Sequence, residues 1–378
     1  MNSQRKNILR DRRRIVIKLG SMVLAGPDGG VDQRLIGALA EEIADLAPKK
    51  YRFVVVSSGA ILMGMHQMGR REAPRTLKVK QALAAVGQGL LMNAYEIAFS
   101  RHGINVGQML LTRDGLEDRR RFVNARNTLE TSIRLGIIPI INENDTVAVD
   151  EIQYGDNDLL SSMVVNLTDA DLLVVLTDIA GLYDRDPKLG DGHLIEVVDH
   201  VDDAVFDMAG GPGEAGSGGM SSKVLAAKRT ARMGIPTVIA DGRSRGILTR
   251  ILAGAPEGTL FLPSTEKLAS KKHWISFVGG VNGTLVLDDG AVKALVEDKK
   301  SLLPAGVLEV YGSFEQGSLV RCVNREGDEI ARGVTCFSSV QIQKIMGLHS
   351  REIEPVLGAC PGTEVIHKDD LALKLMTS

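Results

Sequence analysis

The sequence predicts an α/β fold, in which a doubly wound, mainly parallel sheet is followed by a small, mainly β domain. Short apolar runs alternate with helical segments from Arg14 to Ile239, a pattern typical of a parallel sheet with crossover helices. The 378 residues include 41 glycines but only 4% aromatic residues, which indicates an aliphatic core with many tight turns. From Trp274 onward, short strands separated by turn residues indicate a second, smaller domain.

The elements of the first domain follow one another in a regular order. Arg14–Leu19 is an apolar run interrupted by Lys18 and closed by Gly20-Ser21, so we expect a strand that leads into a loop. A helix should follow, with Asp32 capping its start and Pro48 ending it, because apolar residues recur there at helical spacing. We expect further buried strands at residues 53–56, 106–110, 137–141, 172–176 and 237–239. Sheets of this kind bind ligands beyond the carboxyl ends of their strands, so the segments after these runs are candidate sites.

The predicted domains are residues 1–265 and residues 273–378. A polar connector at Pro263–Lys272 separates them. In the second domain we expect one helix at 338–346 and strands at 283–287, 307–311, 318–323 and 329–335.

The charge and hydropathy of the chain exclude some classes of function. A net charge of −2 argues against a protein built mainly to hold nucleic acid or an anionic membrane, because both tasks need a basic surface. No apolar stretch approaches the roughly 20 residues of a membrane span, so we expect no membrane partner. Cys322, Cys336 and Cys360 form no CxxC pair and are expected to be free thiols in a reducing compartment.

The beginning of the chain is basic but lacks the apolar segment of a secretory signal. We expect a frayed, solvated arm that leads straight into the first strand, with a transit peptide as the alternative. Together with the cysteine usage, this favours a cytoplasmic location. The basic residues are Arg5, Lys6, Arg10, Arg12, Arg13 and Arg14.

Two lysines lie next to backbone that could hold an anion. Lys18 is followed by Gly20-Ser21, whose amides could face an anion in a tight turn; the alternative is an edge-strand lysine that reaches to water. Residues 210–219 contain six glycines and lead into a helix that opens with Ser221, Ser222 and Lys223. Exposed amides and the positive end of a helix dipole favour phosphate oxygens there. The alternative is a flexible loop in which Ser221 or Ser222 is a plain N-cap.

Two polar clusters follow the strand at 137–141. Residues 142–145 (Asn-Glu-Asn-Asp) and 155–158 (Gly-Asp-Asn-Asp) could bind an amino group, orient lysines or hold Mg²⁺. Each cluster taken singly is equally typical of a turn or a helix cap. A doubly wound sheet, however, would bring these clusters, both lysines, Ser58-Gly59 and Thr177-Asp178 to one edge. Lysines, a glycine-rich loop and carboxylates without a candidate His or Cys indicate phosphoryl transfer, which requires positioning and charge neutralisation.

The motifs resemble those of the amino acid kinase family, and within it the glutamate 5-kinases that carry a C-terminal PUA domain. The resemblance covers nearly the whole chain and keeps the family's order. It rests on VIKLGS from Val16, VSSGAI from Val56, KQALAAVGQ from Lys80, GQMLLTR from Gly107, INEND from Ile141, GDND from Gly155, VVLTDIAGLY from Val174 and GGMSSK from Gly218. The PUA-like part rests on domain position, short strands and residues 301–307 (SLLPAGV).

The resemblance implies a role for each matched residue. Lys18 and Lys223 would contact the phosphates in catalysis, and Asp158 would hold both lysines. The glutamate-binding residues would be Ser58, Asp145 and Asn157. The residues around ATP would be Lys18, Thr177, Asp178, Ser217, Gly218, Gly219, Met220, Ser221, Ser222 and Lys223. We assign no metal-ligating side chain, although the family uses Mg²⁺ with ATP.

The resemblance also implies a reaction and partners. The expected reaction is ATP-dependent phosphorylation of the side-chain carboxylate of L-glutamate to L-glutamyl 5-phosphate, the first step of proline biosynthesis, with proline as an inhibitor. A glutamyl phosphate reductase would be a functional partner, and the chain would form a homo-oligomer. Gln153 departs from the family, where a lysine is common, so a substrate contact by that lysine is in doubt.

Two alternatives stay open. The chain could be another member of the family, acting on acetylglutamate, aspartate, carbamate or a nucleotide. It could also be a vestigial kinase that binds RNA through its PUA-like domain. From Lys271 onward there are 12 Lys and Arg against 14 Asp and Glu, so charge does not support RNA binding.

Overall fold

A computed structural model describes residues 2–148, 156–187, 190–210, 219–264, 275, 280–358 and 363–373. These residues fall into two compact units, one almost wholly before residue 268 and one almost wholly after it. Most of the polar connector predicted at Pro263–Lys272 lies outside the described residues. So do Gln153, Gly155, Cys360 and residues 211–218 of the glycine-rich loop.

The first unit contains an eight-stranded sheet with the order β3-β4-β2-β1-β5-β7-β8-β6. Every neighbouring pair is parallel except β7 and β8. The predicted doubly wound, mainly parallel sheet is therefore confirmed; the short strands β6 and β8 were not predicted. The strands are β1 Arg14–Leu19, β2 Arg52–Ser57, β3 Val106–Leu111, β4 Ile138–Glu143, β5 Leu172–Thr177, β6 Val197–Val198, β7 Thr237–Asp241 and β8 Thr259–Phe261.

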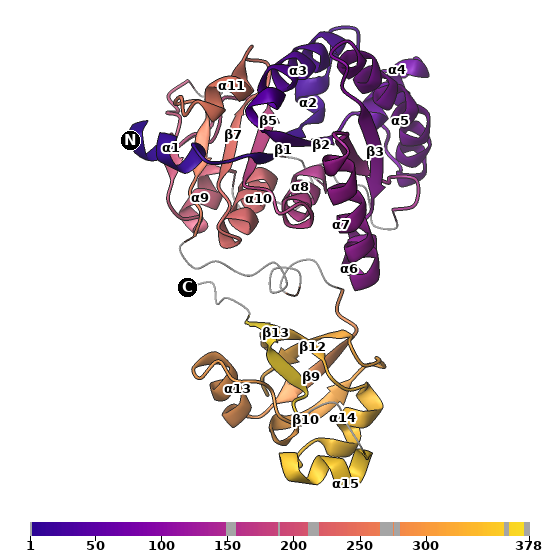
Figure 1. The fold of residues 1–378 in the computed structure, drawn as a ribbon, viewed down its shortest axis with the longest axis vertical. Helices are drawn as coiled ribbons and strands as arrows, with labels where there is room; N and C mark the ends of the chain where they lie inside the picture. The colour runs from indigo at the N-terminus through magenta and orange to yellow at the C-terminus, as the bar shows by residue number, and fades with distance from the viewer. Residues whose placement is uncertain are drawn as a thin grey trace. The chain divides into compact units, whose positions relative to one another are not determined.

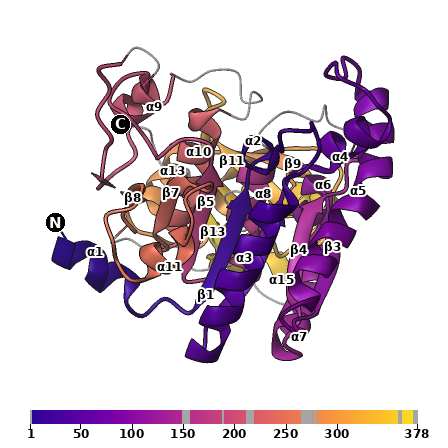
Figure 2. The ribbon, with the colours of Figure 1, turned by 90° about the horizontal axis from the view of Figure 1, so that it is seen from above.

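Helices cover both faces of this sheet, with α3 and α11 on one side and α8 and α10 on the other (Figure 1). Seen from above, α2 and α4, which follow β1 and β2, lie toward the same end of the strands (Figure 2). The helices are α1 Asn2–Leu9, α2 Ser21–Leu24, α3 Gln33–Leu46, α4 Ala60–Gln67, α5 Leu77–Ser100, α6 Arg113–Glu117, α7 Arg119–Arg134, α8 Asp156–Leu167, α9 Asp203–Met208, α10 Met220–Arg232 and α11 Ile247–Leu252.

Local sequence explains where these elements begin and end. The side chain of Asp32 accepts a hydrogen bond from the Arg34 amide at 2.9 Å and caps α3, as predicted. Pro48 lies in the short 3₁₀ turn Ala47–Lys49 that follows this helix. β1 lies between β2 and β5 and is buried, so Lys18 is not an edge-strand lysine that reaches to water.

The basic start of the chain is not a frayed arm, and that prediction was wrong. Residues Asn2–Leu9 form α1, and Leu9 is fully buried in the core. The guanidinium of Arg5 is buried and donates hydrogen bonds to backbone carbonyls of Glu196, Glu257 and Gly258. Because these acceptors lie about 190 to 250 residues away in the chain, no local pattern revealed them.

Helices α4 and α5 cross at very short range. A Cβ atom at Gly64 of α4 would lie 1.9 Å from the carbonyl oxygen of Leu83, and one at Gly87 of α5 would lie 1.8 Å from that of Ala60. Only glycine fits at these two positions without a backbone shift. The crossing therefore fixes α4, whose first residue follows Ser58-Gly59, against the long helix α5.

The second unit is built on a five-stranded sheet with the order β10-β9-β11-β12-β13, in which only β9 and β11 pair in parallel. The strands are β9 Gly283–Leu287, β10 Val307–Tyr311, β11 Leu319–Val323, β12 Glu329–Thr335 and β13 Ile366–Leu373. The prediction of a small β domain is confirmed, but β13 was missed. The prediction of a single helix was wrong, because α13 Asp289–Val296 and α15 Ile353–Leu357 accompany α14 Ser339–Ile345.

Among the helices that the structure describes, none is both long enough and apolar enough to cross a membrane.

Candidate functional site

A cavity of about 450 Å³ lies at the carboxyl ends of the central strands of the first sheet. Eight of the residues to which the resemblance gave a role line it: Lys18, Ser58, Asp145, Asn157, Asp158, Thr177, Asp178 and Lys223. The parallel register explains this, because Lys18 in β1 pairs with Val56 in β2 and Val175 in β5. Segments far apart in the sequence therefore end at one edge.

The remaining predicted nucleotide-binding residues are in or before the first turn of α10. Gly219 is the N-cap of α10, so neither Ser221 nor Ser222 has that role. Gly219, Met220, Ser221 and Ser222 are not among the residues that line the cavity. Ser217 and Gly218 lie outside the described residues.

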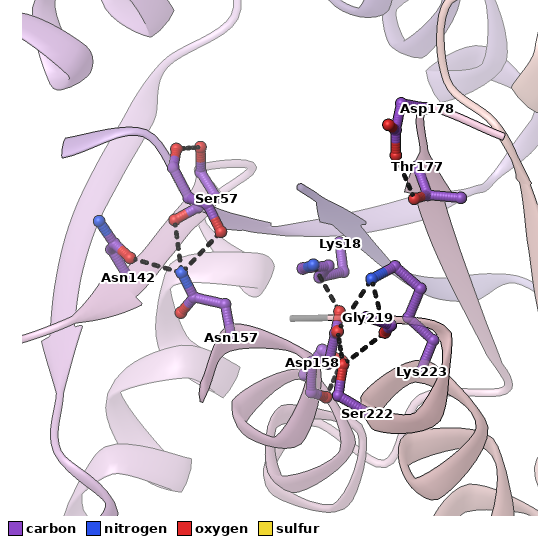
Figure 3. Close-up of polar contacts among 12 residues, drawn as sticks. Lys18, Ser57, Asn142, Asn157, Asp158, Thr177, Asp178, Gly219, Ser222 and Lys223 are labelled. Carbon is purple, nitrogen blue, oxygen red and sulfur yellow. Dashed lines mark hydrogen bonds and ion pairs between the residues drawn. The ribbon is translucent and has the colours of Figure 1, made fainter. Parts of the chain in front are cut away.

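One end of the cavity is a buried cluster of three charged groups. The ammonium groups of Lys18 and Lys223 both pair with the carboxylate of Asp158: Lys18 with Oδ1, and Lys223 with Oδ2 at 3.2 Å (Figure 3). The hydroxyl of Ser222 donates to the same Oδ2 at 2.6 Å. Asp158 is fully buried, and the two lysines are 4% and 6% exposed. One carboxylate from α8 thus places an ammonium from β1 beside an ammonium from α10.

The cluster holds Asp158 in its ionised form. Burial by itself would raise the pKa of Asp158, but the charges of Lys18 and Lys223, with hydrogen bonds from Lys18 and Ser222, outweigh burial and lower this pKa below 3.8. For Lys18 burial dominates, and it lowers the pKa of the ammonium below 10.5 although Asp158 opposes the shift. Asp158 already accepts from three donors, so it is a poor general base.

The other end of the cavity is built from neutral amides and hydroxyls. The Nδ2 group of Asn157 lies 3.0 Å from the Ser58 hydroxyl, 3.0 Å from Asn142 Oδ1 and 3.3 Å from the Ser57 carbonyl (Figure 3). Asn142 is 2% exposed, and its own Nδ2 donates to Gln88 Oε1 at 2.7 Å. Asn157 Oδ1 is buried and accepts no hydrogen bond from any described residue.

Next to the charged cluster, Thr177 is the last residue of β5 and Asp178 follows it. The hydroxyl of Thr177 donates to Asp178 Oδ1 at 3.1 Å, and both residues line the cavity. The Gly20 amide donates to the Leu176 carbonyl at 3.2 Å. The sequence had suggested that this amide could face an anion, but its bond to Leu176 leaves it unavailable.

Sequence reasoning missed several residues of the site. Arg71 lines the cavity on the segment between α4 and α5, and nothing in its local pattern distinguished it. Lys80 also lines the cavity; it begins the KQALAAVGQ segment, which was noted as a motif but given no role. That segment ends at Gln88. The described residues contain no group of three or more His, Cys, Asp or Glu side chains that could hold a metal ion.

The fold and the site define a class of protein: a doubly wound α/β domain whose buried carboxylate presents two lysines at the carboxyl edge of its sheet. A family model described as "Amino acid kinase family" matches residues 13–241, and a PUA domain model matches residues 283–357. The chain belongs to the amino acid kinase family, which implies ATP as the phosphoryl donor.

Its similar relatives narrow the comparison further. The chain is 48% identical to glutamate 5-kinase of Citrifermentans bemidjiense over 371 residues, which cover 98% of this chain and 100% of the relative. It is 46% identical to glutamate 5-kinase of Syntrophotalea carbinolica and 47% identical to that of a Geobacter species, again over 98% of this chain and 100% of each relative. The resemblance stated from the motifs is confirmed.

Proposed function

We propose that this chain catalyses the ATP-dependent phosphorylation of the side-chain carboxylate of L-glutamate to L-glutamyl 5-phosphate, the first step of proline biosynthesis. The observation that carries the proposal is the Lys18–Asp158–Lys223 cluster at one end of a cavity whose other end is an uncharged amide network. Relatives named glutamate 5-kinase, at 46–48% identity over 98% of this chain, support the choice of substrate.

The chemistry suits a site in which the carboxylate beside the two lysines is already engaged. A carboxylate oxygen of glutamate attacks the γ-phosphorus, the new O–P bond forms, and the bond from phosphorus to the bridging oxygen breaks as ADP leaves. A carboxylate nucleophile carries no proton at neutral pH, so no base is needed. A hydroxyl nucleophile would need one. Because two lysines and Ser222 already engage Asp158, this arrangement favours an acid over an alcohol as acceptor.

In this mechanism Lys18 and Lys223 neutralise charge on the transferring phosphoryl group, and Asp158 orients both ammonium groups from outside the reaction path. Mg²⁺ would fit this site, because carboxylates such as Asp178 line the cavity and carboxylate and phosphate oxygens are the ligands that it prefers; it would enter together with ATP. When bound, Mg²⁺ supplies further charge neutralisation on those oxygens.

We assign glutamate to the amide end of the cavity, through Ser58, Asp145 and Asn157. Ser58 Oγ accepts from Asn157, so its own proton is left to donate to a carboxylate of the substrate. The carboxylate of Asp145 lies on the same cavity wall and suits an ammonium group. We assign ATP to Lys18, Thr177, Asp178 and residues 217–223; Thr177 and Asp178 line the cavity together with both lysines.

Three further proposals concern control and partners. Proline, like glutamate, carries its amine on the carbon next to its carboxylate, which supports inhibition at an overlapping site. An acyl phosphate hydrolyses readily, which supports a reductase that consumes the product promptly. The resemblance to the family supports a homo-oligomer.

The test of the function is an assay of ADP release with hydroxylamine present to trap an acyl phosphate. Turnover should require both glutamate and Mg²⁺, and the trapped product should be a glutamyl hydroxamate. Acetylglutamate, aspartate, carbamate and UMP serve as competing substrates in the same assay. Turnover of any of these in preference to glutamate would overturn the assignment.

A further inference from the structure

Helix α5 holds the amide end of the cavity through two polar side chains on one face. Gln88 Oε1 accepts from Asn142 Nδ2 at 2.7 Å, and the Tyr95 hydroxyl lies 2.8 Å from Ser57 Oγ. The two residues are seven positions apart, so they are two helical turns apart on the same face. Neither is among the residues that line the cavity. Their contact with the site is therefore indirect, through Asn142 and Ser57.

Two backbone groups determine which way the side-chain amides point. The Glu143 amide donates to Asn142 Oδ1 at 2.9 Å, and a backbone N–H can only donate. Asn142 Nδ2 must therefore point the other way, toward Gln88 Oε1, which accepts it. The Ser57 carbonyl can only accept, so the group of Asn157 that faces it must be Nδ2.

This polarity leaves one acceptor without a partner. With Asn157 Nδ2 committed to Asn142, Ser57 and Ser58, its Oδ1 is buried and accepts no hydrogen bond from any described residue. A buried acceptor needs a donor. The carboxylates of glutamate are acceptors, and its ammonium is its only donor at neutral pH.

We propose that Gln88 is a positioning residue for substrate selection: by holding Asn142, it keeps Asn157 Oδ1 presented to the ammonium group of the substrate. The inference rests on the proposed function. Without the acceptor at Gln88, the buried Nδ2 of Asn142 loses its partner. The present orientation of the Asn142 amide then costs more free energy, and rotation of this amide becomes more favourable. Rotation would remove one of the acceptors of Asn157 Nδ2, so Asn157 would be held only by the Ser57 carbonyl and the Ser58 hydroxyl and its Oδ1 would be less firmly placed.

The decisive variant is Gln88→Met, which keeps the length of the side chain and removes its acceptor. KM for glutamate should rise about tenfold, the order expected for one hydrogen bond lost from a positioned group, while kcat stays within about threefold. KM for ATP should not change. Gln88→Glu retains an acceptor at the same reach and should restore KM to within about threefold of the wild-type value.

Glutarate separates positioning from general damage, because it has both carboxylates of glutamate and no amine. Its inhibition constant against glutamate should change less than twofold in Gln88→Met. Asn93→Met is the matched control, since Asn93 is an exposed amide on the same helix. If Gln88→Met does not fold, Gln88→Ala serves the same comparison with Gln88→Glu.

An unchanged KM for glutamate in Gln88→Met would overturn the inference. An equal rise in the glutarate constant, or no recovery in Gln88→Glu, would also overturn it, because either result points to a purely structural role. These failures differ from failure of the proposed function, which appears in the wild-type protein as an absence of turnover with glutamate.

Discussion

The two ends of the cavity differ in how their polar side chains are held: one end relies on buried ion pairs and the other on hydrogen bonds between neutral groups. At one end, three full charges are buried together: Lys18 and Lys223 on Asp158. At the other end, Asn142, Asn157 and the Ser57-Ser58 pair are neutral, and their order comes from hydrogen bonds that end on backbone groups. Both ends are mostly shielded from water, yet only the first one concentrates charge.

The difference teaches which kinetic constant each end should control. Negative charge shifts among the phosphoryl oxygens only in the transition state, so fixed ammonium groups act mainly on kcat. The amide end contacts parts of the substrate that do not react, so it acts alike on ground state and transition state and appears in KM. Buried charges also depend on one another, because removal of one leaves its partner unpaired.

The largest expected effect follows from Lys223→Met or Lys18→Met, which keeps most of the side-chain volume and removes one ammonium from the charged end. By analogy with loss of one preorganised donor, kcat should fall on the order of 10²–10³-fold, with a smaller change in KM for glutamate. Steady-state kinetics measure this. Lys228→Met, on the same helix as Lys223, is the control and should retain normal kcat. A variant with near-normal kcat would remove that lysine from the mechanism.

Asp145→Ala tests the amide end. A carboxylate on the substrate's ammonium group acts before and during the reaction, so KM for glutamate should rise more than kcat falls, by about tenfold. If proline binds an overlapping site, its inhibition should weaken in the same variant. Asp191→Ala, on an exposed ion pair with Arg185, should alter neither constant. An unchanged KM for glutamate would place Asp145 outside the substrate pocket.

The close crossing of α4 and α5 supports the amide end, and glycine substitutions test it. Gly64→Ala places a Cβ atom 1.9 Å from the Leu83 carbonyl oxygen and should destabilise the protein by about 1–3 kcal/mol. Gly89→Ala is the matched control on α5, because nothing lies within 4 Å of its added Cβ. It should stabilise by about 0.5–1 kcal/mol, since alanine favours a helix over glycine. Equal melting temperatures for the two variants would contradict this packing.

The pH dependence of kcat should reflect the charged end, because burial lowers the pKa of Lys18 there. Burial lowers the pKa of Lys18, so the alkaline decline of kcat should begin below pH 10.5. Between this lowered pKa and 10.5 the unfolded chain binds more protons, so the contribution of Lys18 to stability rises with pH. Asp158 has a lowered pKa, so its stabilising contribution is present above pH 3.8 and is lost as pH falls through the folded value.

Profiles of kcat between pH 6 and pH 10.5 test this for the wild type and for Lys18→Arg. Arginine stays protonated over that range, so the part of the alkaline decline due to residue 18 should disappear from the residual activity of the variant. A wild-type kcat that stays level to pH 10.5 would contradict the effect of burial on Lys18.

The smallest expected effect is that of removing the second unit. Every residue assigned to the site precedes residue 268, so the fragment Met1–Lys267 should fold and keep kcat and KM for glutamate within about threefold of the full chain. Inhibition by proline is the property that we expect to differ most between the fragment and the full chain, because a domain outside the active site can still affect regulation. A folded fragment without activity would show that the second unit helps to complete the site.

The sequence by itself determined most of the secondary structure of the sheet and part of the membership of the cavity. Apolar runs between turn residues are a local signal, so the strands at residues 14–19, 283–287, 307–311 and 329–335 match their predicted bounds. Two-residue strands such as β6 carry almost no such signal. Parallel pairing then places strand ends together, which is why Lys18, Ser58, Asn157 and Thr177 could be grouped before any contact was known.

Only the tertiary structure decided how these side chains are held. Asn142 lies 54 residues from Gln88 in the sequence, and Lys223 lies 65 residues from Asp158, so no local periodicity encodes either bond. The hydroxyl of Ser222 donates to Asp158, a contact that no local pattern indicated. Arg5 was expected in solvent, but it lies buried against backbone carbonyls of distant segments. Buried polar groups take whichever partner the packing brings within reach, and that partner depends on the whole fold.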